Sequence, residues 1–160
     1  MSGSGLPRRL LLGGLFVPAV AQAGGTPAAA TLGGGQAPEV SAFAEHRLAL
    51  QLSERDPHRQ DLVLSVANNV LKAYGPDKVA IEVVAFGPGI DLLRQESPHR
   101  IGVDSLVAQG VRFDVCMNTV ETIARETGRR PAINPHAIPV EAGVVQLMTL
   151  AETGYTLVRP

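Results

Sequence analysis

The sequence has no tryptophan, a single cysteine and few aromatic residues, which make up 4% of its 160 positions. One cysteine cannot form a disulfide within the chain, so the folded state must depend on a hydrophobic core. A chain of this length can bury such a core in one domain. Because aromatic side chains are scarce, the core must be mainly aliphatic, which is typical of parallel strands buried on both faces.

An excess of positive charge is also missing. The formal net charge is −1, and no cluster combines basic with aromatic residues, so binding to nucleic acid is not expected. No His-x-x-x-His or Cys-x-x-Cys spacing occurs, so we predict no dedicated metal site. Gly87-Pro88-Gly89 matches neither a Walker loop nor a dinucleotide fingerprint, and we predict no bound cofactor.

The first 23 residues have the pattern of a secretory signal peptide. Arg8 and Arg9 form its basic part, residues 10–20 form an apolar run, and Ala21-Gln22-Ala23 matches a cleavage site. This run is shorter than the about 20 residues that span a bilayer, so we expect no stable membrane span. An uncleaved anchor and an ordinary helix are the alternatives. The paired arginines also suggest a twin-arginine signal, and we predict a periplasmic or secreted protein.

Residues 24–42 are rich in Gly, Ala and Pro, which predicts a flexible leader before a domain at residues 43–160. Strand and helix patterns alternate along that domain, which predicts a three-layer α/β/α fold with a mostly parallel sheet of about five strands. The predicted strands are residues 46–52, 79–86, 111–116, 138–140 and 155–158. The predicted helices are residues 57–74, 90–94, a segment between Pro98 and Gly110, 119–127 and 142–152.

Apolar spacing predicts which helix faces pack against the sheet. The predicted packing residues are Leu62, Val66, Val70 and Tyr74 in the first helix, flanked by Val63, Ala67 and Leu71, and Val145, Leu147, Met148 and Leu150 in the last.

The lone thiol, Cys116, ends the third predicted strand. Reacting groups of open parallel sheets gather beyond the carboxyl ends of the strands. Asn118 and Glu121 form a predicted capping box just after it, and the helix N-terminus would favour an anion there. We therefore expect a lowered pKa and a reactive thiol at Cys116. A buried structural cysteine is the alternative.

Several neighbouring residues are candidates for a supporting role at this thiol. His136 lies in the loop before the fourth strand and His99 follows Pro98, so each is a candidate to approach Cys116. Gly87 and Gly89 follow the second strand, where a tight turn is expected rather than a phosphate site. Asn118 and Thr119 come directly after Cys116 and complete the candidate set.

The order and spacing of several short motifs resemble the DsrE/DsrF-like family over residues 46–160. The motifs are Gly87-Pro88-Gly89, Gln109-Gly110-Val111-Arg112-Phe113, Cys116-x-Asn118-Thr119, Val140-x-Ala142-Gly143-Val144, Leu150-x-x-x-Gly154-Tyr155 and Pro160. The resemblance implies a homo-oligomer, often a trimer or hexamer. It also implies a sulfur carrier or sulfurtransferase-like protein whose Cys116 forms a persulfide and exchanges sulfur with a protein or a small sulfur compound. The alternative is an oligomeric binding or assembly module of the cell envelope in which Cys116 is structural.

Overall fold

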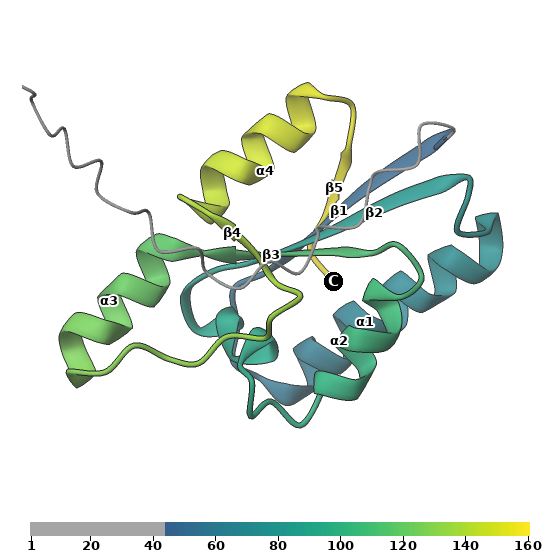
Figure 1. The fold of residues 1–160 in the computed structure, drawn as a ribbon. Coiled ribbons are helices and arrows are strands. Elements are labelled where there is room, and N and C mark those ends of the chain that lie inside the picture. The colour runs from purple at the N-terminus through teal and green to yellow at the C-terminus, as the bar shows by residue number, and fades with distance from the viewer. Residues whose placement is uncertain (1–43) are drawn as a thin grey trace, which may run out of the picture. The chain divides into compact units, whose positions relative to one another are not determined.

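The computed structural model describes residues 44–160, so the predicted signal peptide and leader lie outside the described residues. Strands and helices alternate along the described part of the chain (Figure 1). In chain order they are β1 (His46–Leu52), α1 (Pro57–Tyr74), β2 (Val79–Ala85), the 3₁₀ helix η1 (Gly87–Leu93), α2 (Arg100–Val107), β3 (Arg112–Cys116), α3 (Met117–Thr127), β4 (Ile138–Val140), α4 (Gly143–Glu152) and β5 (Thr156–Val158).

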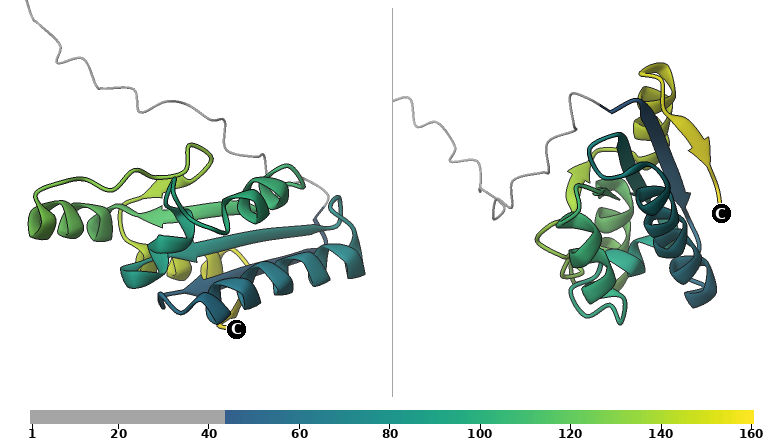
Figure 2. Two further views of the ribbon diagram at one scale, coloured as in Figure 1. Left: turned by 90° about the horizontal axis from the view of Figure 1, so that it is seen from below. Right: turned by 90° about the vertical axis from the view of Figure 1, so that its right-hand side faces the viewer.

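The five strands form one sheet in the order β4-β3-β2-β1-β5, and every neighbouring pair is parallel. Helices α1 and α2 cover one face of this sheet and α4 covers the other (Figures 1 and 2). The predicted three-layer α/β/α fold is therefore confirmed. Pro139 lies in the edge strand β4, where a missing N–H group is tolerated.

Side chains of β3 alternate between the two faces of the sheet. Phe113 and Val115 belong to the larger core cluster, which lies under α1 and α2. Asp114 pairs in register with Val84, a member of the smaller cluster under α4, so Asp114 points to the α4 face. Cys116, two residues further along, shares that face because strand side chains repeat every second residue. The sheet therefore separates the thiol from α1 and α2.

The predicted packing faces of two helices need correction. In α1 the buried line runs through Val63, Ala67 and Leu71, whereas Leu62 and Tyr74 are exposed. Apolar residues occur on adjacent lines of this helix, so spacing alone did not identify the line that faces the sheet.

In α4, Leu147 and Leu150 are buried as predicted, but Val145 and Met148 are 60% and 59% exposed. A helix that lies on a sheet with no other helix beside it contacts the sheet through a narrow stripe only.

The turn after β2 is held in place by close backbone packing. Gly87 has φ of 51°, a conformation that favours glycine, and it begins η1. A Cβ atom on Gly89 would lie 2.4 Å from the carbonyl oxygen of Leu52 at the end of β1. The predicted tight turn is thus present, and the short helix predicted at residues 90–94 is a 3₁₀ helix that starts three residues earlier.

Candidate active site at Cys116

Cys116 is both the last residue of β3 and the N-cap of α3. The helix begins at Met117, two residues before the predicted start, because the strand leads into it without a loop. The predicted capping box is therefore wrong. Asn118 lies in the first helical turn, and its backbone N–H donates to the carbonyl oxygen of Glu141 at 3.2 Å.

Opposing effects act on the pKa of the Cys116 thiol. Burial is the largest and raises the pKa. Hydrogen bonds from the Thr119 side chain and from the backbone N–H groups of Gly143, Thr119 and Asn118 together outweigh it, so the net pKa lies below its ordinary value. Asn118 and Thr119 belong to the first turn of α3, and Gly143 is the first residue of α4. Two helix N-termini thus direct N–H groups at one sulfur atom and stabilise its thiolate form.

The hydroxyl group of Thr119 is oriented by the turn after β2. Its oxygen accepts a hydrogen bond from the backbone N–H of Gly87 at 2.9 Å. The hydroxyl proton is therefore free to be donated to the Cys116 sulfur, in agreement with the lowered pKa. Of the predicted supporting residues, the structure brings Gly87, Asn118 and Thr119 together around the thiol, while Gly89 packs against β1.

Replacing Thr119 with valine is expected to raise the pKa of Cys116 by about one unit, because a hydrogen bond to a charged group is lost. Thr119→Ser keeps the hydroxyl and is expected to leave the pKa close to that of the parent. The pH dependence of alkylation by iodoacetamide measures both. Equal pKa values in the valine and serine variants would show that the hydroxyl does not act on the sulfur.

Cys116 is only 5% exposed, and the segment between β4 and α4 contacts it. Its Sγ atom lies 4.0 Å from the carbonyl oxygen of Glu141 in that segment. A pocket of about 400 Å³ lies close by, with Arg55, Pro88, Asn118 and Thr119 in its wall. Thr119 thus lines the pocket and also bonds the thiol. Because so little of the Cys116 side chain is exposed, we expect its thiol to react faster with small reagents than with bulky ones.

Neither candidate histidine reaches the thiol. Cys116 pairs with Val140 at the end of β4, whereas His136 precedes the first residue of β4. His136 lies in the turn before β4, so the whole of β4 separates it from Val140 along the chain. His99 lies before α2, and its Nδ1 atom is 3.1 Å from Asp61 of α1, on the face of the sheet opposite Cys116. Neither histidine is among the groups that act on the pKa of the thiol, because register and sheet face, which depend on tertiary packing, bring other residues to it.

A pair of buried acids under α4 was missed by the sequence analysis. Glu82 and Asp114 are 3% and 0% exposed. Glu82 accepts a hydrogen bond from Gln146 of α4 at 2.7 Å and lies 3.3 Å from the Nε atom of Arg112. Burial, followed by a hydrogen bond to Glu82, raises the pKa of Asp114 to about 9. Asp114 is therefore protonated at neutral pH and shares its proton with Glu82.

A signal for this pair was present in the sequence. Glu82 interrupts the otherwise apolar strand β2, and a strand buried on both faces has no solvent side for it.

The described residues, 44–160, contain no group of three or more His, Cys, Asp or Glu side chains placed to hold a metal ion. None of their helices is long and apolar enough to cross a membrane.

Fold and site together define an α/β/α protein with one low-pKa thiol at the carboxyl edge of a parallel sheet. No family model and no curated protein matches the sequence. A solved structure does match, that of MTH1491 from Methanobacterium thermoautotrophicum, a protein of unknown function. It is 30% identical, with a TM-score of 0.63, over 72% of this chain and 100% of the other. The chain therefore belongs to the same family as MTH1491.

Proposed function

We propose that this chain is a sulfur carrier or sulfurtransferase-like protein in which Cys116 holds sulfane sulfur as a persulfide. The observation that carries the proposal is the set of hydrogen-bond donors from two helix N-termini and Thr119 that lowers the pKa of Cys116. A thiolate is the nucleophilic form of cysteine, and a lowered pKa increases its population at neutral pH.

The proposed reaction consists of two thiol exchange steps. The Cys116 thiolate attacks the outer sulfur of a donor persulfide R–S–SH, a new S–S bond forms, and R–S⁻ leaves. An acceptor thiolate then attacks the outer sulfur of the Cys116 persulfide, takes the SH group, and releases the Cys116 thiolate. No electrons are gained or lost overall, so the carrier needs no redox cofactor for this cycle.

The resemblance to the DsrE/DsrF-like family supports this function and adds proposals about assembly and location. We propose a homo-oligomer, a trimer or hexamer, and a periplasmic or secreted protein that exchanges sulfur with a partner protein or a small sulfur compound. The apolar side chains of Val144, Val145 and Met148 on the outer surface of α4 are more than half exposed, which favours burial against another subunit.

Cys116→Ser is expected to abolish sulfur loading while leaving fold and oligomeric state unchanged. After incubation with thiosulfate, polysulfide or a low-molecular-weight persulfide, intact-protein mass spectrometry should show one added sulfur atom on the parent chain. A reductant should remove it. Equal loading of the serine variant would contradict the proposal.

A second candidate function is an oligomeric binding or assembly module of the cell envelope, with Cys116 in a structural role. The small exposed fraction of Cys116 favours it. Rapid alkylation of the native thiol at neutral pH would exclude this alternative. Absence of both alkylation and sulfur loading would support it and exclude the sulfur-carrier function.

A further inference from the structure

A second hollow, of about 700 Å³, lies between the end of η1 and the carboxyl-terminal half of α3. Backbone pairing connects its two sides, since Arg94 forms an antiparallel bridge with Ile133 and the N–H of Gln95 donates to the carbonyl oxygen of Ala132 at 3.0 Å. This pairing gives the hollow a fixed backbone on the side of residues 94–95 and 132–133. Its volume is within the range of pockets that bind small molecules.

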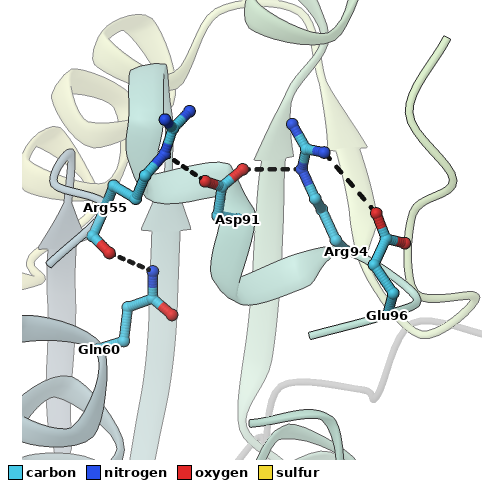
Figure 3. A network of polar contacts seen from close by, with 5 residues as sticks. All are labelled: Arg55, Gln60, Asp91, Arg94 and Glu96. Atoms are coloured by element: carbon cyan, nitrogen blue, oxygen red, sulfur yellow. Dashed lines mark hydrogen bonds and ion pairs between the residues drawn. The ribbon is translucent and has the colours of Figure 1, made fainter. Parts of the chain in front are cut away.

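The charged side chains around this hollow are mainly basic. Arg94, Arg129 and Arg130 line it, together with a single acid, Glu96. The Nε atom of Arg94 lies 2.7 Å from Asp91, which also pairs with Arg55, and its Nη1 atom lies 3.6 Å from Glu96 (Figure 3). These contacts hold the Arg94 side chain at one position in the wall.

The other two arginines differ in their partners. Arg130 pairs with Glu121 of α3 at 2.8 Å. For Arg129, no carboxylate of the described residues lies within ion-pair distance of the guanidinium group. The backbone N–H of Arg129 donates to the Thr127 hydroxyl at 3.4 Å, and that hydroxyl donates to the carbonyl oxygen of Ile123 at 2.7 Å, so the backbone of Arg129 is tied to the end of α3. The hollow therefore presents one arginine whose charge is not compensated by a carboxylate of residues 44–160.

Apart from Thr127, the remaining wall is apolar. Ile123 contributes one side of it, and Pro131 and Ala132 contribute the other. We propose that this hollow binds a small organic anion, in which a carboxylate, sulfonate or phosphate group contacts Arg129 and an apolar body contacts Ile123 and Pro131. A guanidinium group matches the geometry of such oxyanions and forms strong charge-assisted hydrogen bonds with them. This inference goes beyond the proposed sulfur chemistry, because Cys116 does not line the hollow.

The test compares two fluorescent probes that share an apolar body and differ in charge. One is 8-anilinonaphthalene-1-sulfonate and the other is the uncharged N-phenyl-1-naphthylamine. The chain has no tryptophan, so its own emission does not interfere. Arg129→Gln is expected to weaken sulfonate binding about tenfold, the loss of one charge-assisted hydrogen bond, and to leave the uncharged probe unaffected.

Arg125→Gln is the matched control. Arg125 is an exposed arginine of α3, four residues before Arg129. It is bonded to the Thr122 hydroxyl at 2.9 Å and does not line the hollow. Sulfonate affinity should be unchanged in this variant and in Cys116→Ser. Sulfonate binding that is equal in the parent and Arg129→Gln, or that falls only when Met148 of the α4 surface is replaced by glutamine, would overturn the proposal. An equal loss in Arg125→Gln would also overturn it, since the effect would then reflect general surface charge.

Discussion

At pH 8, Asp114→Asn is expected to be more stable than the parent by at least about 2 kcal/mol, because one unit of pKa shift corresponds to about 1.4 kcal/mol. The pKa of Asp114 rises from 3.8 in its ordinary state to about 9 in the folded protein, through burial and its hydrogen bond to Glu82. Asparagine has the same shape as aspartic acid and is neutral at every pH, so folding does not require it to bind a proton. Its NH₂ group can donate a hydrogen bond to Glu82.

The sign of the pH dependence follows from proton binding. Below about pH 4 the Asp114 carboxyl is protonated in both the folded and the unfolded state, so it does not reduce the stability of the parent. Between about pH 4 and about pH 9 the unfolded state binds fewer protons than the folded state, so the stability of the parent falls as the pH rises. This loss of stability reaches its full size above about pH 9, where the Asp114 carboxyl ionises in the folded protein as well.

Urea unfolding at several pH values from 5 to 9 measures this effect as the difference between variant and parent. The difference should grow with pH. Glu126→Gln, which removes an exposed carboxylate of α3, is the control and should stay within about 0.5 kcal/mol of the parent throughout. A difference between Asp114→Asn and the parent that does not change with pH would show that Asp114 is ionised in the folded protein.

Gly143→Ala is expected to lower the alkylation rate of Cys116 at neutral pH about tenfold, because one unit of pKa corresponds to a tenfold change in thiolate fraction. A Cβ atom at Gly143 would lie 2.9 Å from the Cβ atom of Phe86. The N-terminus of α4 must then move, and the Gly143 N–H that bonds the sulfur moves with it. We also expect a loss of about 1 to 3 kcal/mol of stability, typical of overpacking.

A double variant separates the clash from other effects of the methyl group. In the double variant Phe86→Gly, Gly143→Ala, residue 143 gains a Cβ atom and residue 86 loses its side chain, so the clash between them is removed. The pKa of the thiol should then return toward that of the parent, even though the packing of the Phe86 ring is lost. A thiol pKa that is unchanged in Gly143→Ala would show that the α4 terminus does not stabilise the thiolate.

The sequence was informative wherever a local pattern has one structural solution. Pro57 follows Asp56, a pattern typical of a helix start, and the Asp56 side chain accepts a hydrogen bond from the N–H of His58 and caps α1. The aliphatic run of β2 proved to be a strand buried on both faces, and Pro139 is at an edge of the sheet. Such patterns depend on residues that are neighbours in the chain, so the structure they predict does not depend on contacts with distant parts of the fold.

The sequence by itself determined the alternation of strands and helices, the parallel sheet, and the position of Cys116 at a strand's carboxyl end. Only the tertiary structure decided which residues surround the thiol. Gly143 is brought to Cys116 by the pairing of β3 with β4, whereas the same register keeps His136 away. The shared proton of Asp114 likewise depends on β2 lying beside β3 under α4. These contacts join residues that are distant in the chain, so their geometry is set by strand register and sheet face, which no local pattern encodes.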